Sequence, residues 1–152
     1  MTTGEIHGGG CLCGAIRYSL KGQPSHATVC YCTQCQKQTG SLVPAMVTYE
    51  LENVELLAGT PAVFRSSTIA TRQFCDRCGS TLFWRGDGRT EVDIFMGTLD
   101  DPSTMPAPSL ELWTTHRAKW LAHLDGTESH ETSQTPDETD QRAALAARDI
   151  SR

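Results

Sequence analysis

The seven cysteines of this sequence are the residues best suited to chemistry. They form a C-x-C pair, a C-x-C-x-x-C cluster and a C-x-x-C pair: Cys11, Cys13, Cys30, Cys32, Cys35, Cys75 and Cys78. Residues two apart in a strand point to the same side, and a tight turn brings together the sulfurs of a C-x-x-C. Each pair can therefore supply half of a metal site. Thiolate-rich tetrahedral sites select zinc over magnesium or calcium, so zinc is the predicted metal.

One partition joins the C-x-C pair to the C-x-x-C pair. It gives a closed, structural zinc site, the four-cysteine group, made of Cys11, Cys13, Cys75 and Cys78. A glycine follows each of these pairs, Gly14 and Gly79, and tolerates the positive φ of a metal-binding turn. A rival partition joins the C-x-C pair to the first two cysteines of the central cluster. A disulfide framework is a further alternative, which the odd cysteine count and the C-x-C spacing disfavour.

The central cluster then forms a three-cysteine group of Cys30, Cys32 and Cys35, with one coordination position open. A zinc ion with an open position can lower the pKa of a bound thiol or polarise an aldehyde carbonyl. We therefore predict that this group is catalytic and acts on carbon–sulfur bonds. A histidine could instead close the site, and four are candidates: His7, His26, His116 and His123.

Other side chains are candidates for the surroundings of such a site. Four arginines could bind the carboxylates of a peptide-like thiol such as glutathione: Arg72, Arg77, Arg85 and Arg117. Three tryptophans are expected to fill the core or to line the pocket wall: Trp84, Trp113 and Trp120. No general base is assigned from the sequence.

The bulk properties favour one small domain with small-molecule partners. The chain has 152 residues and a net charge of -5, from 13 Lys and Arg against 18 Asp and Glu. This balance disfavours nucleic acid and anionic membranes as partners. No apolar stretch is long enough for a membrane helix and no export signal is recognisable, so a cytoplasmic location is predicted.

The elements that must position the cysteines are mainly β. Six short β-prone runs, bounded by glycine and proline, predict antiparallel sheets from residues 15–20, 27–30, 43–49, 54–57, 81–85 and 91–96. One short helix is predicted at 33–38, stopping at Gly40. The zinc domain is predicted to span residues 1–125. A polar tail is predicted at 126–152, with a short helix at 136–149.

The three cysteine clusters resemble those of the glutathione-dependent formaldehyde-activating (Gfa) family. The resemblance rests on residues 9–18, 30–35, 39–41, 74–80 and 82–84, where glycines and aromatic residues flank the cysteines, and extends to 98–102, Trp113 and 117–120. It covers residues 5 to 125. Tyr31 departs from the family pattern, because histidine is common at this position.

The resemblance implies a β-tent fold of short antiparallel sheets around the structural zinc, with a catalytic zinc on the three-cysteine group. It also implies the addition of glutathione, as the thiol cosubstrate, to formaldehyde or a related aldehyde. The product would be S-(hydroxymethyl)glutathione, which makes the reaction a carbon–sulfur lyase step in reverse. Two other functions stay open: a non-catalytic zinc-binding interaction module, and a metal buffer or thiol-redox sensor.

Overall fold

The structure, a computed structural model, describes residues 4–133. Its strands are β1 Ile6–Gly10, β2 Arg17–Lys21, β3 His26–Cys30, β4 Ala45–Glu50, β5 Val54–Ala58, β6 Ala62–Arg65, β7 Ala70–Phe74, β8 Thr81–Gly86, β9 Glu91–Phe95, β10 Leu110–Leu112 and β11 Glu128–Ser129. The α-helix is α1 Thr33–Thr39, and one-turn 3-10 helices occur at Leu51–Asn53, Met96–Thr98, Pro102–Thr104 and Thr114–His116. Within this part of the chain no helix is long and apolar enough to cross a membrane.

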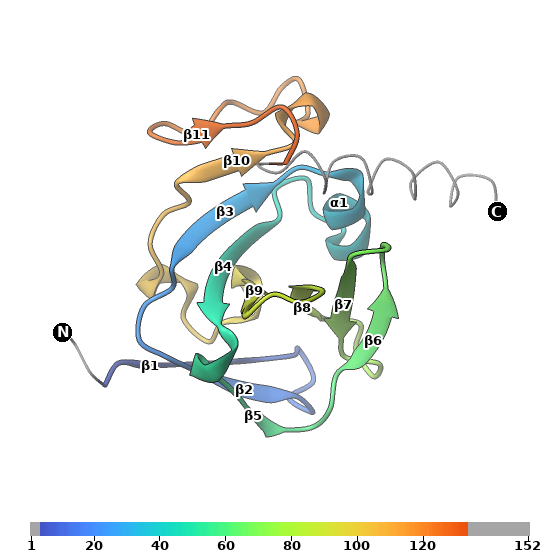
Figure 1. Cartoon of the computed structure of the whole chain (residues 1–152), viewed down its shortest axis with the longest axis vertical. Helices are drawn as coiled ribbons and strands as arrows, with labels where there is room; N and C mark the ends of the chain where they lie inside the picture. The colour runs from blue at the N-terminus through green and yellow to red at the C-terminus, as the bar shows by residue number, and fades with distance from the viewer. Residues whose placement is uncertain (1–3, 134–152) are drawn as a thin grey trace.

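The strands form two sheets (Figure 1). One has three strands in the order β1-β2-β5, and the other has eight in the order β11-β10-β3-β4-β9-β8-β7-β6. This confirms the predicted mainly β class with one short helix. All six predicted strands appear with ends within two residues of those observed. Five strands were missed: β1, β6, β7, β10 and β11.

The predicted antiparallel sheets are observed, and two parallel strand pairs are added at one edge of the larger sheet. Most neighbours are antiparallel, but β10 pairs in parallel with both β3 and β11. Parallel pairing needs a long crossover, and the crossover here runs through the whole middle of the chain. A three-residue strand and a two-residue strand carry no readable alternation, so neither their existence nor their direction was visible in the sequence.

Residues beyond the boundary predicted after residue 125 also take part in strand pairing. Residues 128–129 form β11, whose neighbours continue the pairing: the Trp113 N–H donates to Thr132 O at 3.2 Å, and the Thr114 N–H to His130 O at 3.1 Å. Polar composition suggested a tail, but these bonds use the backbone and need no apolar side chain. The folded unit therefore extends through residue 133, and the helix predicted at 136–149 lies outside the described residues.

The helix α1 directly follows the second cysteine of the central cluster. Cys32 is its N-cap, and its sulfur accepts a hydrogen bond from the Cys35 N–H at 3.3 Å. The helix ends at Gly40, whose φ of 66° is the left-handed C-cap that the sequence predicted. One helical turn thus brings the last cysteine of the cluster back over the first two.

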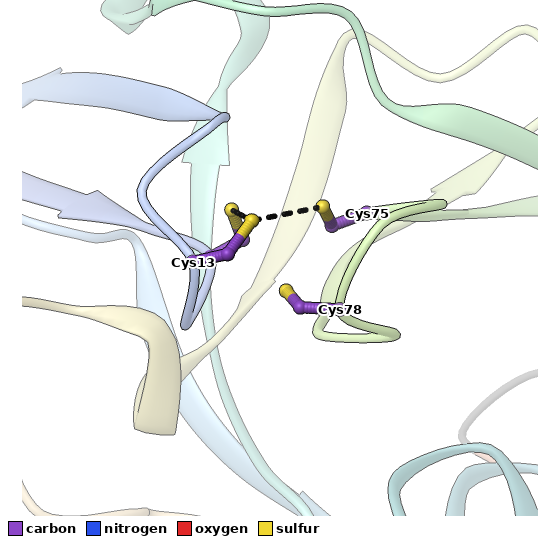
Figure 2. A group of neighbouring side chains, drawn as sticks. Cys13, Cys75 and Cys78 are labelled. Carbon is purple, nitrogen blue, oxygen red and sulfur yellow. Dashed lines mark hydrogen bonds between the residues drawn. The ribbon is translucent and has the colours of Figure 1, made fainter.

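Two turns from different sheets face each other (Figure 2). The turn between β1 and β2 carries the C-x-C pair, and the turn between β7 and β8 carries the C-x-x-C pair. Each turn places a glycine at positive φ after its last cysteine, with φ of 77° for Gly14 and 78° for Gly79. The predicted role of these two glycines is confirmed, because other residues adopt this φ only with strain.

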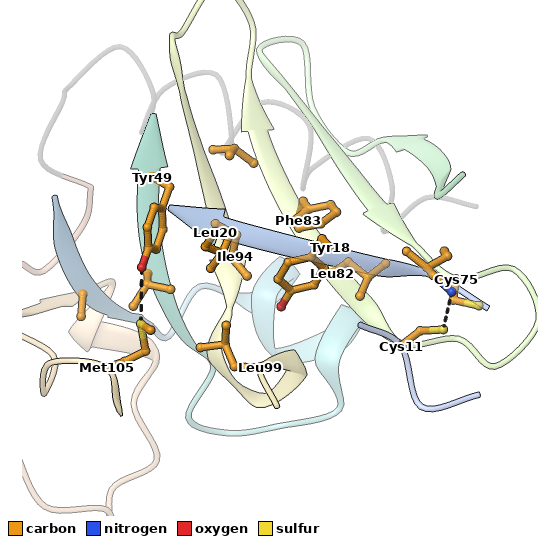
Figure 3. Packing of buried hydrophobic residues seen from close by; sticks show 14 residues of the cluster. Cys11, Tyr18, Leu20, Tyr49, Cys75, Leu82, Phe83, Ile94, Leu99 and Met105 are labelled. Atoms are coloured by element: carbon orange, nitrogen blue, oxygen red, sulfur yellow. Dashed lines mark hydrogen bonds between the residues drawn. The ribbon is translucent and has the colours of Figure 1, made fainter. Parts of the chain in front are cut away.

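The hydrophobic core lies between the two sheets (Figure 3). Tyr18 and Leu20 of β2 are fully buried and lie over Leu82 and Phe83 of β8 and Ile94 of β9. The rings of Tyr18 and Phe83 meet edge to face with centroids 5.1 Å apart. The core therefore fixes the three-stranded sheet against the large one, next to the facing cysteine turns.

We expect Gly9→Ala to destabilise this contact between the sheets. A Cβ at Gly9 would overlap the buried ring of Tyr18, and overpacking of this kind costs about 1–3 kcal/mol. Urea unfolding of the zinc-loaded protein measures the loss. Gly97→Ala is the matched control, because a Cβ at Gly97 meets nothing within 4 Å. Equal unfolding midpoints for the two variants would contradict the proposed close approach.

Candidate functional site

The cysteines assemble into two separate groups of sulfur atoms. In the four-cysteine group, all ligand atoms lie within 4.8 Å of one another. Cys13 Sγ lies 3.6 Å from Cys11 Sγ and 3.8 Å from Cys75 Sγ, and the side chains converge from both turns (Figure 2). The grouping agrees with the first partition and not with its rival. Four convergent thiols are the donor set of a closed zinc site, so these residues fit the implied metal.

The thiols of this group differ in acidity. Hydrogen bonds from Ser80 lower the pKa of Cys78 to about 5. A hydrogen bond from Ala15 lowers the pKa of Cys13, but burial and the neighbouring thiols outweigh it and raise the pKa to about 11. Like charges thus oppose full ionisation of the group. A divalent cation would remove this conflict, because coordination deprotonates a thiol outright.

The three-cysteine group is deeply buried. Its members Cys30, Cys32 and Cys35 are 2%, 4% and 2% exposed, and their sulfur atoms lie within 4.8 Å of one another. Among the described residues no histidine or acidic side chain joins them. The side chains of Cys32 and Cys35, together with burial, raise the pKa of Cys30 well above its ordinary value. Three crowded thiols of this kind fit a thiophilic cation that has a further position available.

Arg72 is the one predicted arginine that touches this group. It is 1% exposed, and its Nη1 and Nη2 atoms lie 3.5 and 3.4 Å from Cys35 Sγ. Arg77 and Arg85 are exposed, and Arg117 pairs with Glu111 at 3.6 Å. The Cys30 side chain and the Arg72 charge lower the pKa of Cys35, but the Cys32 side chain and burial outweigh them and raise it above its ordinary value. Arg72 therefore places a buried positive charge in contact with Cys35.

A small cavity of about 100 Å³ opens beside Cys30 and Cys35, and we refer to it as the reaction pocket. Three polar side chains on adjacent strands share it: His26, Thr48 and Asp93. His26 Nε2 lies 3.0 Å from Thr48 Oγ1, and the Thr48 hydroxyl donates to Asp93 Oδ1 at 2.6 Å. The pocket therefore combines a metal-binding group with a hydrogen-bonded carboxylate.

Sheet register explains how these three residues meet. His26 of β3 lies opposite Thr48 of β4, which lies opposite Asp93 of β9. Side chains directly opposite across neighbouring strands share one face. Burial raises the pKa of Asp93 above its ordinary value, although the Thr48 hydroxyl and His26 act against this. Sequence reasoning missed Asp93 and Thr48 because they come from separate strands with no motif spacing.

Two tryptophans belong to the wall of the reaction pocket. Trp84 and Trp113 line it and are buried, as predicted, whereas Trp120 is 76% exposed and does not belong to the core. Trp113 has φ of 58°, in the left-handed region that a bulky residue rarely adopts. The backbone pairing with Thr132 holds it there. The segment that was predicted as a tail thus helps to shape the pocket.

Glu111 is a fully buried carboxylate that connects this segment to the cysteines. It accepts hydrogen bonds from the Tyr31 hydroxyl at 2.6 Å and from the Thr127 hydroxyl at 2.9 Å, and it pairs with His123. Burial raises its pKa, but the hydrogen bonds from Tyr31 and Thr127 outweigh burial and hold the pKa below its ordinary value. Tyr31, the departure from the family pattern, therefore anchors the chain between Cys30 and Cys32.

We expect Glu111→Gln to lower the free energy of unfolding by about 2 kcal/mol, because Tyr31 and Thr127 lose a charged acceptor in a buried place. Urea unfolding at neutral pH measures this loss. Glu55→Gln, on the exposed face of β5, is the control and is expected to change stability by less than about 0.5 kcal/mol. Indistinguishable midpoints would show that the buried network contributes nothing.

Comparison with known proteins places this chain. The profile of the family described as glutathione-dependent formaldehyde-activating enzyme matches residues 6–116. Among solved structures, a Rhodobacter sphaeroides protein from a structural genomics programme superposes with a TM-score of 0.52 at 19% identity, covering 66% of this chain and 96% of that one, which supports the fold alone. Curated proteins give no match. The matched residues include all seven cysteines, and the chain belongs to the glutathione-dependent formaldehyde-activating enzyme family.

Proposed function

We propose that this protein is a zinc-dependent enzyme of the carbon–sulfur lyase type that condenses glutathione with formaldehyde or a related small aldehyde. One observation carries the proposal: Cys30 and Cys35 of the three-cysteine group and the half-buried Asp93 line a single small pocket. A volume of about 100 Å³ suits an aldehyde of one or two carbons better than a bulky one. The family to which the chain belongs is named for this chemistry.

The three-cysteine group would hold the catalytic zinc, and the four-cysteine group the structural one. Zinc at the former would supply a Lewis acid that lowers the pKa of an incoming thiol or polarises a carbonyl. Asp93 is suited to accept the thiol proton, because its raised pKa makes it a stronger base than an exposed aspartate. As the sulfur–carbon bond forms and the carbonyl π bond breaks, the proton passes to the carbonyl oxygen.

The surrounding residues would position this proton transfer. Thr48 donates to Asp93 Oδ1 and holds the carboxylate in place, while His26 sets the orientation of the Thr48 hydroxyl. Trp84 and Trp113 limit the access of water to the pocket. A dry pocket strengthens each of these electrostatic interactions.

Two-dimensional exchange NMR tests the reaction directly. Formaldehyde and glutathione interconvert with their adduct without a catalyst, so the measured quantity is the added exchange rate per unit of zinc-loaded protein. We expect a rate that rises in proportion to the protein concentration. Exchange that is unchanged by the protein would reject this reaction.

Asp93→Asn is expected to lower the catalysed exchange rate by about 100-fold, the usual contribution of a general base. The unfolding free energy at neutral pH is expected not to fall, because the amide removes the cost of ionising a buried carboxyl. This split between rate and stability separates a catalytic role from a structural one. Asp125→Asn, at an exposed site, is the control. A full rate in Asp93→Asn would assign the proton transfer to another group.

A binding role has one observation in its favour. Large apolar side chains are exposed on the edge strands β5 and β6: Leu56, Leu57, Val63 and Phe64 are 47%, 58%, 62% and 56% exposed. Exposed edges with apolar side chains are suited to docking another chain. An unchanged exchange rate in the presence of protein would make an interaction module the preferred function.

A further inference from the structure

A second cavity, of about 300 Å³, is lined by residues of α1, β6 and β7 together with Ser66. We refer to it as the helix cavity. It is lined by Gln34, Lys37, Gln38, Phe64, Ser66 and Arg72. None of these residues lines the reaction pocket. The two spaces are therefore distinct, and Arg72 stands between the helix cavity and Cys35.

The helix cavity gathers buried polar atoms that lack partners. Within the described part of the chain, six buried side-chain nitrogen or oxygen atoms have no hydrogen bond, and three of them belong to residues of this lining: Gln34 Oε1, Ser66 Oγ and Arg72 Nε. Buried polar groups in proteins are nearly always paired, so unpaired ones call for an explanation. Three such unpaired atoms around one cavity indicate a ligand that forms hydrogen bonds with them.

The geometry of Arg72 specifies part of this ligand. Its Nη1 atom donates to Gln38 Oε1 at 2.8 Å, and Nη1 and Nη2 both contact Cys35 Sγ, so the guanidinium is fixed. The Nε–H remains available toward the helix cavity. Lys37 adds a second positive charge, and no acidic residue is among the lining residues. The complementary group is an anion.

Gln34 narrows the choice of anion. Its side-chain oxygen is an acceptor, so the ligand must present an N–H or O–H donor close to its negative charge. An amino-acid or peptide terminus has both, as a carboxylate beside an ammonium or amide nitrogen. Inorganic phosphate at neutral pH carries an O–H beside its charged oxygens and meets the same requirement, but it has no methylene groups. Exposed Phe64 can cover the methylene groups of such a terminus.

We propose that the helix cavity binds the carboxylate terminus of the peptide thiol, with Arg72 Nε and the Ser66 hydroxyl as donors and Gln34 Oε1 as acceptor. The identity of the thiol rests on the proposed function. Arg72 contacts Cys35, so the terminus is held one side chain away from the three-cysteine group. The cavity is a specificity site, which separates peptide thiols from simple thiols that lack a carboxylate.

The test uses S-methylglutathione, whose blocked sulfur cannot take part in the reaction. In ¹H–¹⁵N NMR of the zinc-loaded full chain, we expect saturable shifts of the Arg72 Nε–H and the Ser66 amide. Ser66→Ala and Lys37→Gln are each expected to weaken binding about five-fold, the effect of one hydrogen bond or one nearby charge. Lys21→Gln, an exposed lysine on the other sheet, is expected to leave binding unchanged.

The diethyl ester of S-methylglutathione is expected not to shift these signals, because both carboxylates are lost. Equal binding of the ester, equal shifts with inorganic phosphate, or wild-type affinity in both cavity variants would each overturn the proposal. Ser66→Ala removes no protein hydrogen bond, so it should fold normally. Binding of S-methylglutathione without accelerated exchange would reject the reaction alone, and accelerated exchange without binding would reject this site alone.

Discussion

Cys13→Ser is expected to remove most of the folding free energy of this chain. Cys13 is exposed, so the substitution creates no cavity in the core and acts mainly through the loss of one metal ligand. Structural zinc contributes about 10–16 kcal/mol in small peptides. Typical domains are stable by only about 5–15 kcal/mol. A substantial weakening of the zinc site therefore leaves too little stability for the native fold at room temperature.

Near-UV circular dichroism and zinc content together measure this effect. We expect Cys13→Ser to lose the tryptophan signal and to retain fewer than two zinc ions per chain. Leu12→Ser is the control, because Leu12 is the adjacent residue, is 88% exposed and is not a ligand. Its stability is expected to change by less than about 0.5 kcal/mol. If Cys13→Ser unfolds at the wild-type urea midpoint with two zinc ions bound, the four-cysteine group is not the structural site.

The size of this effect follows from where the four-cysteine group lies. One pair comes from the three-stranded sheet and the other from the eight-stranded sheet, and both Cys11 and Cys75 are also members of the hydrophobic core. The metal site and the packing of Tyr18 against Phe83 therefore hold the same two sheets together. Loss of the metal should therefore weaken the packing between the sheets, and loss of the packing should weaken metal binding.

The sequence was most informative where spacing and chemistry coincide. Pairs of cysteines, each followed by glycine, predicted both the grouping of the sulfurs and the positive φ at Gly14 and Gly79. The β-prone run at residues 15–20 predicted β2, in which Tyr18 and Leu20 are fully buried. These signals are local, because they depend on a strand or turn of a few residues.

The parts that were missed depend on contacts between distant strands. The hydrogen-bonded side chains of His26, Thr48 and Asp93 meet only because β3, β4 and β9 align in register. Glu111 looks like any charged residue in the sequence, yet it accepts hydrogen bonds from Tyr31 and Thr127. No periodicity marks such residues, since burial of a polar group is decided by its tertiary partners.

Cys35→Ser is expected to abolish the catalysed exchange while the chain stays folded. The serine oxygen keeps an acceptor for the Arg72 guanidinium, which contacts Cys35 Sγ at 3.4 Å, but it is a poor ligand for zinc. Metal catalysis contributes several kcal/mol, and each 1.36 kcal/mol is a factor of ten in rate. The added exchange rate should therefore fall by at least about 100-fold.

Stability and metal content show whether this loss comes from the site. The three-cysteine group comes from β3, the start of α1 and α1 itself, and none of its members belongs to the three-stranded sheet, so we expect the contacts between the two sheets to remain. We expect native near-UV circular dichroism and about one zinc ion per chain, against two in the wild type. Thr33→Ala, exposed on the same helix, is the control for local effects on α1.

A Cys35→Ser protein that keeps two zinc ions and the full exchange rate would remove the three-cysteine group from the mechanism. If Cys35→Ser unfolds and Thr33→Ala does not, the three-cysteine group is also needed for the fold, and both metal groups are structural. A purely catalytic zinc site can lose one ligand without unfolding the chain.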